Sequence, residues 1–252
     1  MAAKRRLDLL LVERGLAPSR EQARTAVLAG DVLVNGEPAR APSTAVAEDA
    51  AIELTRSPRY VSRGGDKLEH ALRVFALDVR GLVALDVGAS TGGFTDCLLQ
   101  HGASRVYAVD VGYGQLDYKL RNDPRVAVIE RTNIRELSEL PERPDVATID
   151  ASFIGLEKVL PKVIELLRPG GWITALVKPQ FQAQRGEVGK GGVVKDPLVH
   201  AAVLGRMVAW GAEHGLRFGG LTASPLRGPA GNREFFVLWR APETPPQHPV
   251  YS

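Results

Sequence analysis

Cysteine is almost absent from this sequence, and it has neither long apolar runs nor a strong excess of one charge. Cys97 is the only cysteine among 252 residues, which excludes intramolecular disulfides and zinc sites built from several cysteines. No apolar run approaches the roughly 20 residues that span a bilayer, so we expect no membrane insertion. The 32 basic and 29 acidic residues give a net charge of +3, which permits a polyanionic partner without requiring one. An ordinary cytoplasmic globular protein is expected.

The first 57 residues have the pattern of a small α+β unit. A serine N-cap and a glycine C-cap bracket a predicted helix, Arg20–Ala29. Val32–Val34 then predicts a short strand, which Asn35-Gly36 turns, since this dipeptide is the strongest short hairpin signal. Residues 51–54 are the candidate partner strand.

From residue 64 onward, strand-like runs alternate with helical patterns, as in a doubly wound α/β sheet. Seven runs predict strands, at residues 83–87, 105–110, 126–130, 146–150, 171–178, 216–224 and 234–240, with helices such as 156–167 and 197–214 between most of them. We therefore expect two domains, at residues 1–57 and 64–243. A basic, proline-broken linker at residues 58–63 joins them, and a tail at residues 244–252 follows.

A glycine-rich turn links the first of these strands to a helix. Glycines at such a turn let the backbone approach a ligand closely at the helix N-terminus. The Gly-Lys-Ser/Thr ending of a P-loop is missing, which disfavours a nucleoside triphosphatase. An acid that precedes the glycines can meet a cationic amino-acid group, which favours S-adenosylmethionine over the dinucleotide of a dehydrogenase. The predicted cofactor contacts of this turn are Asp86, Gly88, Ser90, Gly92, Gly93 and Phe94.

Polar residues at the ends of the next strands extend the predicted cofactor site. Asp110 is placed to accept hydrogen bonds from a ribose diol. Asn133 and Asp150 are placed to flank the adenine and the sulfonium of the cofactor. Both also have an alternative interpretation as ordinary caps of helices or turns.

Lys178 ends an apolar, strand-like run, where a charge is costly for the fold. Methyl transfer to a hydroxyl needs in-line positioning and removal of the hydroxyl proton. A lysine takes that proton if its surroundings lower its pKa toward neutrality. Asp150 ends the neighbouring strand of the expected sheet. Because the last strand of a class I methyltransferase runs antiparallel, its first residue, Glu234, is expected at the same edge.

Lys67 lies in a turn that enters a helix, and taken alone it would be interpreted as a solvated surface residue. In the order Lys67, Asp150, Lys178 and Glu234, however, these residues resemble the tetrad of FtsJ-like ribose 2′-O-methyltransferases. Their flanking segments resemble the TlyA family over nearly the whole chain. Among them are Ser-Arg-Gly-Gly-Asp-Lys at 62–67, Asp-Val-Gly-Ala-Ser-Thr-Gly-Gly-Phe-Thr-Asp at 86–96, Val-Lys-Pro-Gln-Phe at 177–181 and Gly-Asn-Arg-Glu at 231–234.

The resemblance implies a class I (Rossmann-like) methyltransferase domain with a seven-stranded, mostly parallel sheet, preceded by a small α+β S4-like domain. It implies S-adenosylmethionine-dependent methylation of a ribose 2′-hydroxyl, of cytidine, in 23S and also 16S ribosomal RNA. Ribosomal RNA or ribosomal subunits are then the partners. Lys178 is the implied base, and Asp150, Lys67 and Glu234 orient it and the hydroxyl. Two alternatives stay open: a non-catalytic RNA-binding or ribosome assembly factor, and a hemolysin, a label that this family also carries.

The N-terminal unit resembles the S4 domain of ribosomal proteins, and this resemblance implies an RNA-binding surface. Arginines are the residues expected to contact RNA phosphates. Because acids such as Glu13 and Glu21 interleave with them, an ordinary solvated surface is the alternative. The predicted RNA contacts are Arg5, Arg6, Arg20 and Arg24, with Arg63 in the linker.

The glycine-rich segment 184–195 follows Lys178 and is either a loop that closes over the RNA or a disordered surface loop. Its basic residues are Arg185, Lys190 and Lys195. Three aromatic residues near strand ends are candidates for stacking on a base or on adenine, or for core packing: Tyr113, Phe153 and Phe181. The five histidines show no ligand spacing, so we expect no metal site.

Overall fold

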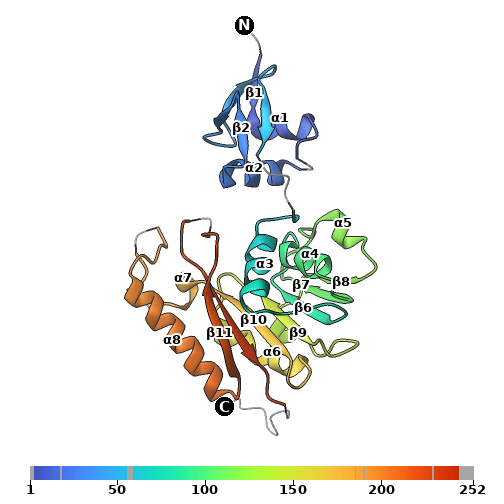
Figure 1. Cartoon of the computed structure of the whole chain (residues 1–252), viewed down its shortest axis with the longest axis vertical. Helices are drawn as coiled ribbons and strands as arrows, with labels where there is room; N and C mark the ends of the chain where they lie inside the picture. Colours follow the sequence, from blue (N-terminus) through green and yellow to red (C-terminus); the bar gives the residue numbers. More distant parts are fainter. Residues whose placement is uncertain are drawn as a thin grey trace. The chain divides into compact units, whose positions relative to one another are not determined.

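The computed structural model describes residues 3–17, 19–55, 59–184, 186–189, 191–228 and 230–243. The chain forms two compact units, Met1–Ser62 and Arg63–Ser252, whose elements are labelled in Figure 1 where there is room. The finer boundaries of the linker and the tail stay predictions, because they depend partly on residues 56–58 and 244–252, which lie outside the described residues.

The N-terminal unit packs two helices against short antiparallel strands. Its elements are β1 (Lys4–Arg6), α1 (Leu7–Glu13), α2 (Arg20–Ala29), β2 (Val32–Val34), β3 (Glu37–Pro38), β4 (Ala45–Ala47) and β5 (Ile52–Leu54). The strands pair as β1-β4 and β3-β2-β5. Helix α2 is confirmed residue by residue: the Ser19 side chain accepts from the Gln22 amide, and Gly30 ends the helix at φ +80°. Leu7, Leu11 and Val32 are fully buried in the core of the unit.

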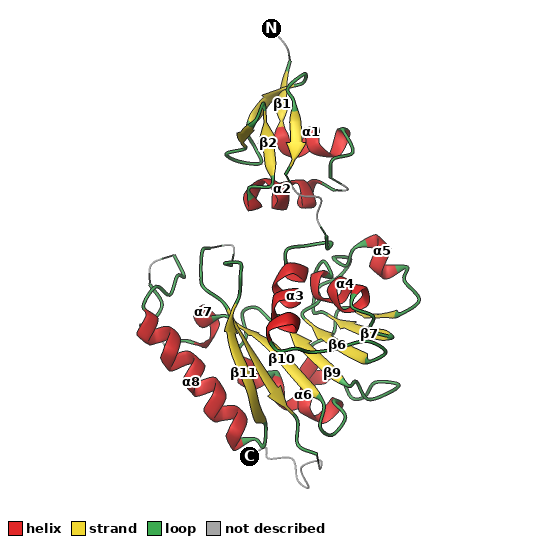
Figure 2. Ribbon diagram, in the orientation of Figure 1, coloured by secondary structure: helices red, strands yellow, loops and turns green. Residues whose placement is uncertain are grey.

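The second unit is a layered α/β domain, with its strands and helices distinguished by colour in Figure 2. Its strands are β6 (Val83–Val87), β7 (Arg105–Val109), β8 (Val126–Ile129), β9 (Val146–Ile149), β10 (Trp172–Val177), β11 (Arg217–Ala223) and β12 (Phe235–Arg240). Its helices are α3 (Gly64–Val74), α4 (Gly93–Gln100), α5 (Tyr118–Arg121), α6 (Leu160–Leu166), α7 (Pro179–Gln182) and α8 (Pro197–Glu213), with 3₁₀ turns η1 (Ile134–Glu136) and η2 (Leu156–Lys158).

The seven strands form one sheet in the order β11-β12-β10-β9-β6-β7-β8. Strands β10, β9, β6, β7 and β8 are parallel, and β12 runs antiparallel to both of its neighbours. The predicted seven-stranded, mostly parallel sheet is therefore confirmed. Because the parallel strands end at one edge, the residues that follow them gather there, as is usual for ligand sites of open α/β sheets.

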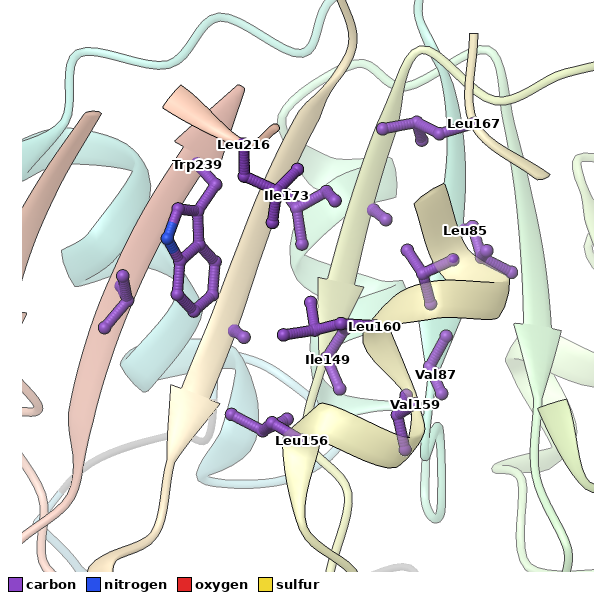
Figure 3. Close-up of a cluster of buried hydrophobic side chains, with 14 of the residues drawn as sticks. Leu85, Val87, Ile149, Leu156, Val159, Leu160, Leu167, Ile173, Leu216 and Trp239 are labelled. Carbon is purple, nitrogen blue, oxygen red and sulfur yellow. The ribbon is translucent and has the colours of Figure 1, made fainter. Parts of the chain in front are cut away.

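Side chains of the central strands alternate between two buried faces, since successive residues of a strand point to opposite sides. Leu85, Ile149, Ile173 and Trp239 lie on the face covered by α6 and α8 and belong to the core that Figure 3 shows. On the other face, Phe94 of α4 packs against Phe236, with ring centroids 6.0 Å apart. Residues of even number on β12, including the position of Glu234 directly before it, thus face the layer of α3 and α4.

Within the described ranges, no helix is both long enough and apolar enough to cross a membrane.

Candidate active site

Strand register brings the predicted catalytic residues to the edge where the parallel strands end. The last register pair of β10 and β12 is Val177 with Phe235, so Lys178 and Glu234 occupy the next position on each chain segment. Asp150 directly follows β9, the neighbour of β10 on its other side. Three residues that are distant in sequence therefore lie on adjacent segments of one sheet edge.

Lys178 forms a largely buried ion pair at this edge. Its Nζ lies 2.6 Å from Asp150 Oδ1 and donates a 2.6 Å hydrogen bond to Ser152 Oγ. Its side chain is 11% exposed and that of Asp150 is 23% exposed. Asp150 Oδ1 is buried and, among described groups, receives no well-directed hydrogen bond. The amine is thus held in one position by two oxygens, one of which has unused acceptor capacity.

Lys67 forms a second buried ion pair, with Glu234. Its Nζ donates to Glu234 Oε2 at 2.6 Å, and the exposed fractions of the two side chains are 11% and 1%. Lys67 lies on α3, 167 residues from its partner. The interpretation of Lys67 as a solvated surface residue is therefore wrong. The structure joins all four residues of the tetrad in two ion pairs, and their catalytic roles stay predictions.

The glycine turn between β6 and α4 is shaped by close packing. Gly88 has φ +83°, and a Cβ at this position would lie 2.7 Å from the Asp150 carbonyl oxygen. Gly92 has φ +96°, and its Cβ would lie 2.3 Å from Leu120 Cδ1. Both positions have a left-handed backbone, which favours glycine, and at Gly88 a side chain would also collide with backbone atoms. The turn is consequently held against the segment that carries Asp150.

Asp110 organises the opposite side of this turn. Its two carboxylate oxygens accept from the Ser90 amide at 2.7 Å and from the Gly112 amide at 2.6 Å. A carboxylate has about four lone-pair sites, so these bonds leave acceptor capacity for the hydroxyls of a ribose. Ser90 itself has φ +48° and is exposed, which leaves the outer surface of the turn open.

Asp86 lies beneath the glycine turn. It has no exposed surface, and its oxygens accept from the hydroxyls of Thr95 at 2.7 Å and Thr148 at 3.1 Å. Burial raises the pKa of the Asp86 carboxyl to about 7, against the opposing effect of these hydroxyl hydrogen bonds. A side chain without exposed surface contacts an ammonium group only if the turn moves, so its expected contact with the cofactor stays a prediction.

Replacing Asp86 with asparagine is expected to change how the stability of the second unit depends on pH. The pKa of Asp86 is higher in the folded protein than in the unfolded chain. Its contribution to the free energy of unfolding is therefore fully present below about pH 4 and declines up to about pH 7. Relative to Asp86→Asn, the wild-type free energy of unfolding should fall by on the order of 2–4 kcal/mol over that interval. Urea unfolding followed by tryptophan fluorescence measures it, since Trp172, Trp210 and Trp239 all lie in this unit.

Asp78→Asn is the control for this measurement. The Arg80 hydrogen bonds lower the pKa of Asp78 to about 2, so its contribution is constant above about pH 4 and is lost only at lower pH. Between pH 4 and 7 the Asp78→Asn curve should run parallel to wild type. A parallel curve for Asp86→Asn as well would contradict the raised pKa.

The remaining predicted cofactor residues have clear structural positions. Gly93 begins α4, and Phe94 is buried against Phe236, so its ring belongs to the core. The Asn133 side chain caps η1 by accepting from the Arg135 amide at 3.2 Å, which agrees with its alternative interpretation as a cap.

Two of the three candidate stacking residues are exposed. Phe153 is 90% exposed, has φ +63° and lies 5.0 Å from Phe181 between ring centroids. Tyr113 is 67% exposed, with the Arg131 guanidinium 4.0 Å above its ring. A large aromatic side chain in a left-handed, exposed backbone position is unusual and is typical of a functional site. Phe153 follows Ser152, the hydrogen-bond partner of Lys178.

Sequence reasoning missed Asn232, which fixes the glycine-rich segment after Lys178. Asn232 is 2% exposed. Its amide accepts from Val194 N and donates to Gly192 O, both at 2.9 Å, while His200 Nε2 donates to Val194 O at 3.0 Å. The end of this segment is thus anchored beside Glu234, two residues further on. Arg185 and Lys190 lie outside the described residues, and Lys195 is exposed. The signal available in the sequence was an asparagine, Asn232, between Gly231 and the predicted catalytic residue Glu234.

The predicted RNA-binding arginines of the first unit are largely paired with acids. Arg5 lies 2.9 Å from Glu13, and both Arg6 and Arg20 contact Asp8. Arg24 is exposed on α2. Arg63, in the second unit, donates to the Arg227 carbonyl at 3.2 Å. Within the described residues, no group of three His, Cys, Asp or Glu side chains is arranged to hold a metal ion.

Comparison with known proteins agrees with this architecture. Residues 60–241 match the FtsJ-like methyltransferase family, and residues 5–52 match the S4 domain family. An S4 domain followed by an FtsJ-like methyltransferase domain defines the class of protein.

Similar proteins identify the family within this class. The chain is 49% identical to the 16S/23S rRNA (cytidine-2′-O)-methyltransferase TlyA of Mycobacterium tuberculosis, over 97% of this chain and 92% of that one. It is 42% identical to Hemolysin A of Brachyspira hyodysenteriae, over 92% and 98% of the two chains. A solved structure from Streptococcus thermophilus, provisionally named a hemolysin, is 42% identical, with a TM-score of 0.77 over 99% of this chain and 93% of that one. The chain belongs to the TlyA family.

Proposed function

We propose that the protein is an S-adenosylmethionine-dependent ribosomal RNA methyltransferase that modifies a ribose 2′-hydroxyl. A cytidine of 23S rRNA is the proposed target, with 16S rRNA as a second substrate. The observation that carries the proposal is the two ion pairs of buried lysines, Lys178–Asp150 and Lys67–Glu234, at the carboxyl edge of the sheet. Two buried lysines beside a glycine turn cost folding energy, and such groups are concentrated at catalytic sites.

The residues around the glycine turn fit S-adenosylmethionine. Gly88 and Gly92 form a turn that no side chain obstructs, and Asp110 retains acceptor capacity for ribose hydroxyls. Asp150 Oδ1, the ion-pair partner of Lys178, retains acceptor capacity, which suits the positively charged end of the cofactor. Ser90, Gly93, Phe94, Asn133 and Asp86 complete the proposed site, with Asp86 and Phe94 supporting the turn from below. When bound, the cofactor supplies an electrophilic methyl group.

The protein must then hold the ribose hydroxyl and accept its proton. Lys178 Nζ, fixed between Asp150 and Ser152, is the proposed acceptor in its neutral amine form, because an ammonium group has no lone pair that takes a proton. Lys67 and Glu234 would orient the hydroxyl from the adjacent segment, because Glu234 lies one position beyond the last register pair of β10 and β12. General base assistance of this kind contributes roughly 10²- to 10⁴-fold to a rate.

The substrate would be recognised by both units. Arg5, Arg6, Arg20 and Arg24 of the S4 domain and Arg63 are the proposed phosphate contacts, since phosphate neutralisation supplies much of RNA affinity. Phe153, exposed beside Ser152, is the proposed platform for the target base, because aromatic stacking stabilises unpaired bases. A ribosomal substrate implies a cytoplasmic location.

The test is to map 2′-O-methylated nucleotides in 16S and 23S rRNA from cells with and without the gene. We expect at least one ribose methylation to disappear without the gene and to return when purified protein and S-adenosylmethionine are added to unmodified subunits. Unchanged methylation in both rRNAs would contradict the proposal and favour a non-catalytic RNA-binding role. A leakage assay with liposomes would separately report a hemolysin activity.

A further inference from the structure

Asp8 is a buried charge in the S4 domain. Its side chain on α1 has no exposed surface, while the side chains of its partners Arg6 and Arg20 are 44% and 53% exposed. Arg6 donates from Nε to Asp8 Oδ1 at 3.0 Å and from Nη2 to Oδ2 at 2.8 Å. Arg20 donates from Nε to Oδ2 at 3.1 Å. A single carboxylate therefore holds two guanidinium groups at the surface.

The three residues come from three different elements. Arg6 is the last residue of β1, Asp8 lies in the first turn of α1, and Arg20 begins α2. The hydrogen bonds to Asp8 use two of the five N–H donors of Arg6 and one of the five of Arg20. The remaining N–H donors of both side chains belong to rigid, planar guanidinium groups that Asp8 holds in place from one side. This geometry suits the oxygens of a phosphate.

We propose that Asp8 is a positioning residue, which fixes Arg6 and Arg20 as a preformed receptor for phosphodiester groups of the RNA backbone. This inference rests on the proposed function, because it concerns how the same RNA is held. A free arginine loses rotamer entropy when it is fixed. Here folding has already fixed both side chains, so less of that loss falls on RNA binding. The Arg6 hydrogen bonds also hold the pKa of Asp8 well below its usual range, so the receptor persists at neutral pH.

A simple charge argument predicts the opposite role. A carboxylate beside two arginines should repel RNA, so its removal should strengthen binding and increase the salt dependence of affinity. The positioning role predicts that Asp8→Asn weakens binding to RNA, on the order of tenfold, although it raises the net charge by one. It also predicts a shallower slope of log affinity against log salt, because fewer phosphates are neutralised in a defined way.

The full-length chain and large ribosomal subunits from a strain that lacks its gene are the materials for this test. Asp78→Asn is the matched control, because Arg80, like Arg6, lies two residues from its aspartate partner and binds it through Nε and Nη2. It adds the same charge and releases an arginine on the other unit, where both side chains are more than half exposed. We expect the control to bind as wild type does. Asp8→Asn binding as tightly as the control, or more tightly, would overturn the inference.

A second variant keeps the test decisive if Asp8→Asn does not fold, which a thermal melt would show. The double variant Arg6→Lys/Arg20→Lys retains the net charge and the partner charges of Asp8, but it removes both planar forks. We expect a loss of affinity of similar size and a shallower salt slope. Wild-type affinity in this variant would overturn the inference. If instead wild type itself neither binds nor methylates the subunits, the proposed function fails and the inference fails with it.

Discussion

Replacing Lys178 with alanine is expected to reduce methyl transfer to ribosomal RNA by on the order of 10³-fold or more, while S-adenosylmethionine binding stays measurable. The substitution removes the group proposed to accept the hydroxyl proton and leaves Asp150 without its ion-pair partner. The glycine turn, which packs on the backbone and not on the side chain of Asp150, should remain intact. Single-turnover methylation of unmodified subunits measures the rate, and calorimetry measures cofactor binding.

Lys178→Arg separates proton acceptance from charge. Arginine keeps a positive charge beside Asp150 and Ser152, but a guanidinium does not release its proton near neutral pH. If Lys178 acts as the base, this variant should be nearly as inactive as Lys178→Ala. The exposed Lys158→Ala is the control for general effects of losing a lysine and should retain wild-type activity. An active Lys178→Arg would assign Lys178 an electrostatic role, and an active Lys178→Ala would contradict the proposed mechanism.

Local signals predicted the elements whose ends are fixed by caps and turns. Helix Arg20–Ala29 and strand Val32–Val34 have the predicted bounds because a serine cap, a glycine and Asn35-Gly36 determine them within a few residues. The predicted helix 156–167 is instead divided into η2 and α6. Pro161 lies in the first turn of α6, and proline favours a helix start because it lacks a backbone donor. Strands β1 and β4 were missed, since three-residue strands that pair across 40 residues carry almost no periodic signal.

The relative positions of the site residues were predictable where sheet topology alone determined them. Asp150, Lys178 and Glu234 follow or precede apolar runs, so the parallel sheet and its antiparallel last strand were sufficient to bring them together. The position of Lys67 was not predictable in this way, because its burial depends on a contact between residues 167 positions apart. The RNA-binding role of the S4-domain arginines stays a prediction, and the pairing of Arg6 and Arg20 with Asp8 was not foreseen, because it depends on how three elements pack. The spacing of residues along the sequence therefore did not reveal these ion pairs.

The buried pair Lys67–Glu234 allows structural and catalytic contributions to be separated. Lys67→Met should lower the free energy of unfolding of the second unit by roughly 3–5 kcal/mol, because it leaves a nearly inaccessible carboxylate without a partner. The partly exposed pair Lys162–Glu165, at 2.8 Å, provides the control, and Lys162→Met should cost about 1 kcal/mol or less. Urea unfolding monitored by tryptophan fluorescence reports both values.

The double variant Lys67→Met/Glu234→Gln removes both charges of the buried pair and keeps similar side-chain volumes. It should regain most of the stability lost in Lys67→Met, because no isolated charge remains buried. Methyl transfer should stay at least about 100-fold below wild type if the pair orients the ribose hydroxyl, since misplaced reacting groups lose roughly that factor. Recovery of stability without recovery of activity therefore identifies a catalytic function of the pair. Recovery of both would show that Lys67 and Glu234 only support the fold, and Lys178 with Asp150 would then have to position the hydroxyl alone.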